Sequence, residues 1–211
     1  MNLRKLLLPF SSLYWIGTSV RNIMYTIGMM PSKSFNIPII NVGNLSVGGT
    51  GKSPHIMYLA NLLKDEKQLS TLSRGYGRKT KGFHIANYST KVYDIGDEPM
   101  QFFQRFKNRI IIAVCEDRVF GAQKLIEHYN AEAILLDDAY QHRAIKAGFN
   151  ILLTDYNNPY YKDFLLPAGD LRESRSGMKR ADIVIVTKCP DRISEDKLKE
   201  ISSKIKLKSH Q

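Results

Sequence analysis

A glycine-rich loop is the feature of this sequence that most constrains its fold. Residues 46–53 read SVGGTGKS, after an apolar run at residues 36–42 and before a helical pattern at residues 53–63. A strand, a glycine-rich loop and a helix in this order are typical of a phosphate-binding loop. The glycines let backbone N–H groups point at a phosphate, and the helix N-terminus adds positive potential. The predicted phosphate-binding residues are Ser46, Val47, Gly48, Gly49, Thr50, Gly51, Lys52 and Ser53.

One position of this loop departs from the usual pattern. Ser46 stands where the first glycine is expected, so a glycine-rich turn with an accidental Gly-Lys-Ser is the alternative. The flanking strand and helix favour the phosphate-binding loop. In such a loop Lys52 reaches the β- and γ-phosphates, and the hydroxyl of Ser53 holds Mg²⁺.

Short apolar runs alternate with helical patterns along most of the chain. This alternation predicts an α/β fold like that of P-loop NTPases, with a mostly parallel sheet and helices on both faces. The expected helices are residues 53–63, 97–106 and 117–129, and the expected strands are residues 36–42, 69–72, 109–114, 133–136, 150–154 and 182–187. An excursion at residues 82–93, with a candidate strand at 83–88, interrupts the alternation. Because ligands bind at the carboxyl ends of parallel strands, the loops after these strands should share one rim.

The chain is strongly basic. Lys and Arg number 31 against 20 Asp and Glu, which gives a net charge of +11. This charge is compatible with nucleic acid, anionic lipid or phosphorylated substrates. No acidic residue precedes Asp65, and this N-terminal bias is the most informative part of the charge distribution. The two cysteines, Cys115 and Cys189, lie far apart in apolar runs, and we expect both to be buried thiols.

The N-terminal segment is predicted to be an amphipathic helix. We assign residues 1–35 to this segment and residues 36–211 to a P-loop lobe. Apolar positions recur at helical spacing, at Leu6, Phe10, Leu13, Gly17, Val20, Met24 and Ile27. The uncharged run at residues 6–20 is shorter than the roughly 20 residues that a membrane-spanning helix needs. A helix lying on a membrane surface fits best, and the alternatives are a helix packed on its own domain, a span or a signal peptide.

Two acidic pairs are candidates for chemistry at a bound phosphate. Asp137 and Asp138 close an apolar strand, where P-loop enzymes place the carboxylate that organises Mg²⁺; an exposed turn is the alternative. Asp97 and Glu98 stand between a glycine and a proline at a predicted helix start, where Asp97 can serve as the N-cap. A kinase needs a carboxylate that accepts the proton of the acceptor hydroxyl. Asp97 is the candidate base, and Glu98 is its metal-binding or positioning partner.

Two loops carry side chains that could bind an anionic substrate. Residues 73–79 read SRGYGRK and contribute Arg74, Tyr76 and Arg78 at the expected rim. The loop at residues 166–173 contributes Arg172 and Glu173, and Gln141 follows the Asp137-Asp138 pair. We predict that these residues bind substrate or support the site; a basic surface loop is the alternative for residues 73–79.

Two other classes of function remain open on the residues alone. The last expected strand ends in Thr187-Lys188-Cys189-Pro190, which faintly resembles the Asn/Thr-Lys-x-Asp motif with which GTPases read guanine. Pro190 at the fourth position argues against guanine specificity. A P-loop GTPase or ATPase switch of the metallochaperone kind is therefore one alternative. A nucleic-acid-binding protein is the other, and it predicts steeply salt-dependent binding, but no aromatic-rich RNA motif supports it.

Together these motifs resemble those of the tetraacyldisaccharide 4′-kinase (lipid A 4′-kinase) family. The resemblance covers nearly the whole chain in the family's order, through residues 42–54, 73–78, 96–99, 137–142 and 171–173. The family also lacks the first glycine of the loop, so Ser46 supports the resemblance.

The resemblance implies an ATP-dependent and Mg²⁺-dependent kinase that phosphorylates the 4′-hydroxyl of a tetraacyldisaccharide 1-phosphate in lipid A biosynthesis. It implies that Asp97 is the base, that Asp137 and Asp138 serve metal and nucleotide, and that Glu173 supports the site. It also implies a peripheral protein on the cytoplasmic face of the inner membrane, in contact with its lipid substrate and an anionic membrane surface. We expect no nucleic-acid partner and predict no protein partner. The family continues into a second lobe that supplies a histidine for the catalytic aspartate, so we expect this chain to be truncated, with nucleotide binding retained.

Overall fold

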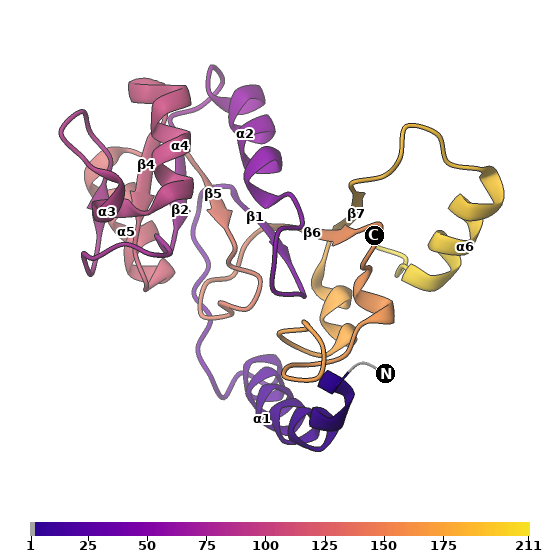
Figure 1. Ribbon diagram of the computed structural model, residues 1–211. Helices are drawn as coiled ribbons and strands as arrows, with labels where there is room; N and C mark the ends of the chain where they lie inside the picture. The colour runs from indigo at the N-terminus through magenta and orange to yellow at the C-terminus, as the bar shows by residue number, and fades with distance from the viewer. Residues whose placement is uncertain (1–2) are drawn as a thin grey trace. The chain divides into compact units, whose positions relative to one another are not determined.

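The computed structural model describes residues 3–211, and the chain divides into two compact units (Figure 1). Unit 1 comprises Met1–Met30, Gly43–Gly51 and Asn150–Gln211, and unit 2 comprises Pro31–Val42 and Lys52–Phe149. One boundary falls inside the glycine-rich loop, which continues from unit 1 into the first residues of unit 2. The predicted division into residues 1–35 and residues 36–211 assumes that each part is continuous in sequence, and it stays a prediction.

Among the described residues, the strands of unit 2 are hydrogen-bonded in the order β3-β4-β2-β5-β1, and in unit 1 β6 neighbours β7. Their bounds are β1 Ile39–Asn44, β2 Leu69–Ser73, β3 His84–Ile85, β4 Ile111–Val114, β5 Ala133–Asp137, β6 Phe149–Asp155 and β7 Ile183–Thr187. Within unit 2, β2 pairs in parallel with β4 and β5, β1 pairs in parallel with β5, and only the short β3 pairs antiparallel, with β4. Every residue of β2 and β5 is buried, as expected for parallel strands that are covered on both faces. The predicted mostly parallel α/β sheet is confirmed.

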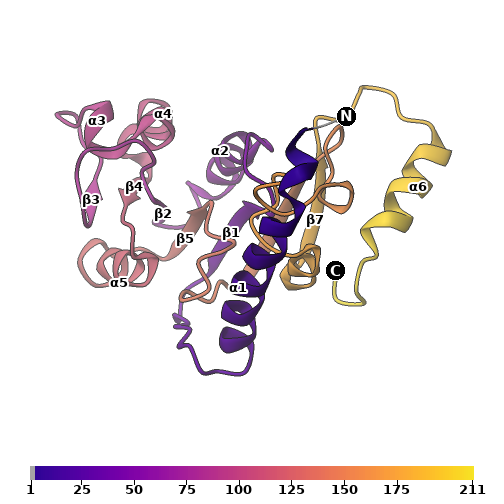
Figure 2. The ribbon, with the colours of Figure 1, turned by 60° about the horizontal axis from the view of Figure 1, so that its bottom comes forward.

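The helices of unit 2 cover both faces of its strands. They are α2 Lys52–Leu63, α3 Val92–Ile95, α4 Asp97–Phe106 and α5 Arg118–Tyr129, with a 3₁₀ turn η2 at Lys107–Arg109. Figure 2 shows α2 and α4 on one side of these strands and α5 on the other. The hydrophobic core includes Leu72, Ile134 and Leu136 from the strands and Ala122 and Leu125 from α5.

Unit 1 combines the N-terminal helix with the C-terminal part of the chain. Its strands β6 and β7 run parallel to each other. Its helical elements are η1 Leu3–Leu7, α1 Leu8–Thr26, η3 Tyr160–Lys162, η4 Arg175–Arg180 and α6 Glu195–Ile205.

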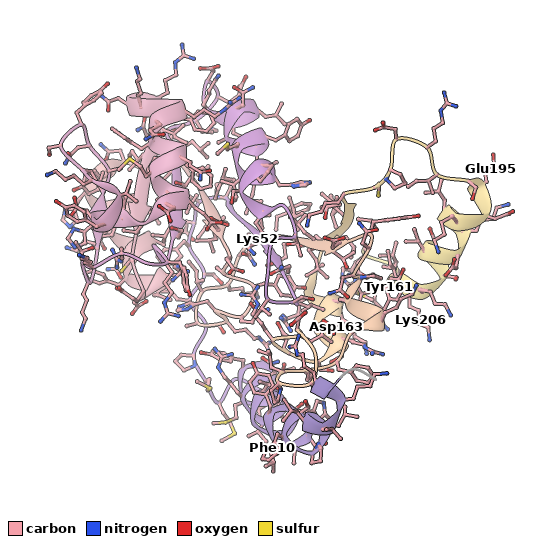
Figure 3. The ribbon with its side chains drawn as sticks, in the orientation of Figure 1. Phe10, Lys52, Tyr161, Asp163, Glu195 and Lys206 are labelled. Atoms are coloured by element: carbon pink, nitrogen blue, oxygen red, sulfur yellow. The ribbon has the colours of Figure 1, made fainter. Side chains whose placement is uncertain are left out.

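Helix α1 turns its polar side toward the rest of unit 1 and its apolar side outward. The hydroxyl of Ser11 donates to the carbonyl of Leu165 (2.9 Å), and the hydroxyl of Tyr14 donates to the carbonyl of Arg172 (2.9 Å). The apolar side chains on the outward side of α1 and of the residues next to its ends are 52% to 67% exposed: Leu6, Phe10, Leu13, Val20 and Ile27. Figure 3 shows Phe10 projecting from α1. Among residues 3–211, no helix has the length and apolar character needed to cross a membrane.

Three local expectations need correction. Asp97 is not the N-cap of α4, because Gly96 holds that position with φ 94° and Asp97 begins the first turn. Cys115 is buried as expected, but Cys189 is exposed, because β7 ends at Thr187 and the chain turns away through Lys188 at φ 56°. The candidate strand at residues 83–88 is reduced to the two residues of β3.

Candidate active site

The glycine-rich loop in unit 1 adopts backbone angles that favour glycine. Gly48 and Gly51 have φ angles of 107° and 84°. A Cβ atom built on Gly48 or Gly49 would meet no atom within 4 Å, so a ligand can approach the backbone there. Ser46 is buried and forms an isolated antiparallel β-bridge with Leu171, while Val47 is exposed. The loop therefore has the open, backbone-lined character that phosphate binding requires.

Polar groups of unit 1 hold this loop in place. Asn44, which is fully buried at the end of β1, donates from Nδ2 to Oγ1 of Thr50 (2.8 Å). The hydroxyl of Thr187 donates to the carbonyl of Thr50 (2.9 Å), and the N–H of Val47 donates to the carbonyl of Asp170 (2.7 Å). Our sequence analysis did not assign this role to Asn44 or Thr187. Both are polar residues at the last position of an apolar strand, and this pattern is the signal that could have found them.

In unit 2 the first turn of α2 meets two of the predicted carboxylates. Nζ of Lys52, labelled in Figure 3, lies 3.7 Å from Oδ1 of Asp138. The hydroxyl of Ser53 donates to Oε1 of Glu98 (2.9 Å). Asp138 has a φ of 50°, and strained backbone of this kind clusters at functional sites. The structure thus brings four of the predicted residues together.

Asp137 is the most unusual carboxylate of this cluster. It is 1% exposed, and neither carboxylate oxygen has a hydrogen-bond partner among residues 3–211. Burial above all, and then the charges of Glu98 and Asp138, raise the pKa of this carboxyl to about 7, although Lys52 and Arg118 oppose them. A buried carboxylate without a partner is costly, and a bound cation would supply the missing interaction.

These residues fit a magnesium ion that is shared with bound phosphates. Mg²⁺ prefers oxygen ligands, and in nucleotide sites one or two carboxylates hold it together with substrate phosphates. Ser53, Glu98, Asp137 and Asp138 offer such oxygens. Within residues 3–211, no group of three or more His, Cys, Asp or Glu side chains could hold a metal ion. In nucleotide sites, water molecules and substrate phosphates usually supply the remaining ligands of Mg²⁺.

A buried arginine near the aspartates was missed by the sequence analysis. Arg118 is 3% exposed, and its Nη1 donates to two backbone carbonyls just beyond β4 (3.0 and 3.1 Å). Burial above all, and then the nearby charge of Arg74, lower the pKa of Arg118 to about 10, while Asp138 and Asp137 act in the opposite direction. The guanidinium is still protonated at neutral pH, so it supplies a fixed positive charge. Its place directly after the carboxyl end of a strand was the available signal.

Two close backbone contacts set the start of α4 against the 73–79 loop. A Cβ atom on Gly96 would come within 2.5 Å of the carbonyl oxygen of Tyr76. Gly75 has φ 72°, and a Cβ atom there would lie 2.6 Å from the carbonyl oxygen of Ile95. Both positions therefore require glycine. Asp97 is exposed directly after this contact, so its carboxylate is accessible to a ligand.

The other predicted substrate residues of unit 2 differ in their surroundings. Arg74 and Tyr76 are exposed, the latter at 89%. The side chain of Arg78 is almost fully buried, and its Nη2 donates to Oε1 of Glu116 (2.6 Å) and to a backbone carbonyl of the excursion (2.7 Å). Gln141 is half-buried. Arg78 thus connects the 73–79 loop to the 82–93 excursion and to Glu116. The substrate-binding roles of Arg74, Tyr76, Arg78 and Gln141 stay predictions.

Arg172 and Glu173 lie inside unit 1. Nη2 of Arg172 donates to the carbonyl oxygen (3.0 Å) and to Oδ1 of Asn44. Glu173 is 2% exposed, and its Oε1 accepts a hydrogen bond from Nη2 of Arg180 (2.7 Å). Both side chains therefore have structural contacts, and one of them touches the residue that holds the glycine-rich loop.

The whole described chain matches a known protein family. Residues 3–211 match the model of the family described as "Tetraacyldisaccharide-1-P 4'-kinase". The chain belongs to this family. The motif resemblance found in the sequence is thereby confirmed.

Curated relatives with the family's name are similar along the full chain. A tetraacyldisaccharide 4'-kinase of Flavobacterium johnsoniae is 52% identical over 210 residues, which are 99% of this chain and 62% of the relative. One from Bacteroides fragilis is 49% identical over 213 residues, which are 100% of this chain and 56% of the relative. The chain thus spans about three fifths of the length of these relatives.

A solved structure shares the fold. The crystal structure of an LpxK from Aquifex aeolicus, described as an "apo" form in complex with ATP, has a TM-score of 0.81 and 39% sequence identity to this chain. The match covers 92% of this chain and 62% of the Aquifex chain. This similarity confirms the predicted P-loop-like α/β fold.

Proposed function

We propose that this chain is the nucleotide-binding part of an ATP-dependent kinase that phosphorylates the 4′-hydroxyl of a tetraacyldisaccharide 1-phosphate. The observation that carries the proposal is the buried, unpartnered Asp137 beside Lys52, Ser53 and Glu98, in a member of this family. The name of the relatives supports the acceptor, and the ATP bound to the Aquifex aeolicus protein supports the nucleotide.

The described residues suggest a role for each part of the site. Backbone N–H groups of residues 47–51 bind the phosphates, and Lys52 offsets their charge. Asp97 accepts the proton of the acceptor hydroxyl while that oxygen bonds to the γ-phosphorus and ADP leaves. Bound Mg²⁺ supplies positive charge to the phosphates, and Ser53 and Asp137 would hold it. Positioning and electrostatic stabilisation provide most of the acceleration.

No observation favours the GTPase switch. The hydroxyl of Thr187 donates to the carbonyl of Thr50, and Lys188 forms an ion pair with Asp155 (2.7 Å). Thr187 and Lys188, the first two residues of the GTPase-like motif, are thus engaged in contacts within unit 1. The fourth residue, Pro190, has no carboxylate with which to read guanine.

We also propose that α1 holds the protein on the cytoplasmic face of the inner membrane. Its outward apolar side chains, together with exposed Lys5 and Arg21, are typical of helices that bind an anionic lipid surface. Cosedimentation with vesicles that contain phosphatidylglycerol tests this role. Leu13→Ser should reduce binding and Ser12→Ala, an exposed neighbour, should not; equal binding by both variants would contradict the proposal.

Phosphate transfer from γ-labelled ATP to the disaccharide 1-phosphate in detergent micelles tests the kinase assignment. The assay compares this chain with the same chain joined to the part of the Flavobacterium johnsoniae relative that lies beyond the matched region. Transfer by either protein that is lost in Asp97→Asn supports the assignment. Bound ATP without transfer by either protein would reject it.

A further inference from the structure

One short segment of unit 1 contacts both α1 and the end of β1, which leads into the glycine-rich loop. We call residues 171–173 the bridge segment. The N–H of Arg172 donates to the carbonyl of Leu45 (2.7 Å), and its carbonyl accepts from the hydroxyl of Tyr14 (2.9 Å). The backbone of a single residue is therefore bonded to Leu45, the residue just before the glycine-rich loop, and to α1.

The side chain of Arg172 extends this connection into the loop. Asn44 uses its Nδ2 group to donate to Thr50, so its Oδ1 must point away from Thr50. Arg172 donates to that Oδ1 and to the carbonyl of the same asparagine. The guanidinium thus fixes which way the amide faces, and the amide fixes Thr50, two residues before Lys52.

The side chain of Glu173 anchors the bridge segment to α1. Its Oε2 accepts from Nδ2 of Asn22 (3.0 Å), and its Oε1 accepts from Arg180. A Cβ atom on Gly177 would lie 2.9 Å from Oε2, so the glycine leaves room for the carboxylate. The buried Glu173 carboxylate would be left uncompensated without its partners, and loss of a partner from a buried charge is strongly destabilising. The hydrogen bond from Asn22 joins the bridge segment to the polar side of α1, and Arg180 holds the other carboxylate oxygen.

We propose that Arg172 and Glu173 are positioning residues that couple the conformation of the glycine-rich loop to the contacts of α1 with the bridge segment. This inference rests on the proposed function, because it takes the loop as the nucleotide site. Asn22 and Tyr14 hold the bridge segment, and the bridge segment orients Asn44. Loss of a contact at α1 therefore weakens phosphate binding at a loop that α1 itself does not supply.

Three variants and a control test this coupling. Asn22→Ala removes the donor to Glu173, Arg172→Met removes the donor to Asn44, and Arg172→Lys restores one donor. Ser12→Ala is the control, because its hydroxyl bonds the carbonyl of Leu8 within α1. The readouts are the Kd for ATP, the melting temperature, and the hydrogen exchange of amides 45–51 without nucleotide.

Asn22→Ala and Arg172→Met should weaken ATP binding about fivefold to tenfold and speed exchange of amides 45–51, as a coupling free energy of typical size predicts. Arg172→Lys should recover part of the affinity, and Ser12→Ala should change neither readout. A lower melting temperature with unchanged loop exchange would overturn the proposal. If the unaltered chain binds no ATP, the proposed function fails, whereas exchange of the loop still decides the coupling.

Discussion

Replacing Asp137 with asparagine should stabilise the metal-free chain at neutral pH. The pKa of this carboxyl is raised from 3.8 to about 7, a difference of roughly three pH units. Because each unit corresponds to about 1.4 kcal/mol, ionisation costs the folded chain up to ~4 kcal/mol. The folded chain keeps the proton between about pH 4 and pH 7, so its stability falls as the pH rises through that window. Asparagine has no proton to lose and avoids this cost.

Urea unfolding followed by circular dichroism measures the effect, in EDTA and without nucleotide, from pH 5 to pH 8. The free energy of unfolding of Asp137→Asn should exceed that of the unaltered chain by an amount that grows with pH. Asp65→Asn, at an exposed position in the turn after α2, controls for the loss of one negative charge. A difference that stays constant with pH, or a less stable variant at pH 8, would refute the reasoning.

Three further predictions concern the same site. Lys52→Ala should lower phosphate transfer about a hundredfold or more, because a preorganised charge at the phosphates is lost; unchanged turnover would remove Lys52 from the site. EDTA should abolish transfer and added Mg²⁺ should restore it, whereas transfer in EDTA would argue against a metal at Asp137. Gly96→Ala should destabilise the chain by about 1–3 kcal/mol in urea unfolding. Gly82→Ala, at a similar φ of 78° but with no atom within 4 Å, should cost less, and an equal cost would show that the contact with Tyr76 is unimportant.

The elements that were predicted well carry local signals. The strands around Leu72 and Leu136 are short, apolar runs, and such runs can be recognised without knowledge of their neighbours. The glycine-rich loop was found for the same reason, since its residues are contiguous. The start of α4 was placed correctly, but its N-cap was not, because the contact of Gly96 with Tyr76 lies twenty residues away in sequence.

The features that were missed depend on distant partners. Nothing near Asn22 in sequence indicates that it bonds Glu173, which lies 151 residues later. The amphipathic pattern of α1 could be read from the sequence, but which side faces the protein could not, because the polar side finds its partners in the 163–173 region. Arg118 was missed for a related reason: charged residues are mostly exposed, and only the fold shows that this one is buried.

The division of unit 1 into separate stretches has a consequence for synthesis on the ribosome. Helix α1 is made first, yet the residue that bonds Asn22 follows 151 residues later. At about 5–20 residues per second, this delay is roughly 8–30 s. In proteins, most of the stability of a helix comes from tertiary packing and not from helix propensity. During that interval the polar partners of α1 within residues 163–173 have not yet been made, so the rest of unit 1 cannot stabilise the helix until synthesis reaches them.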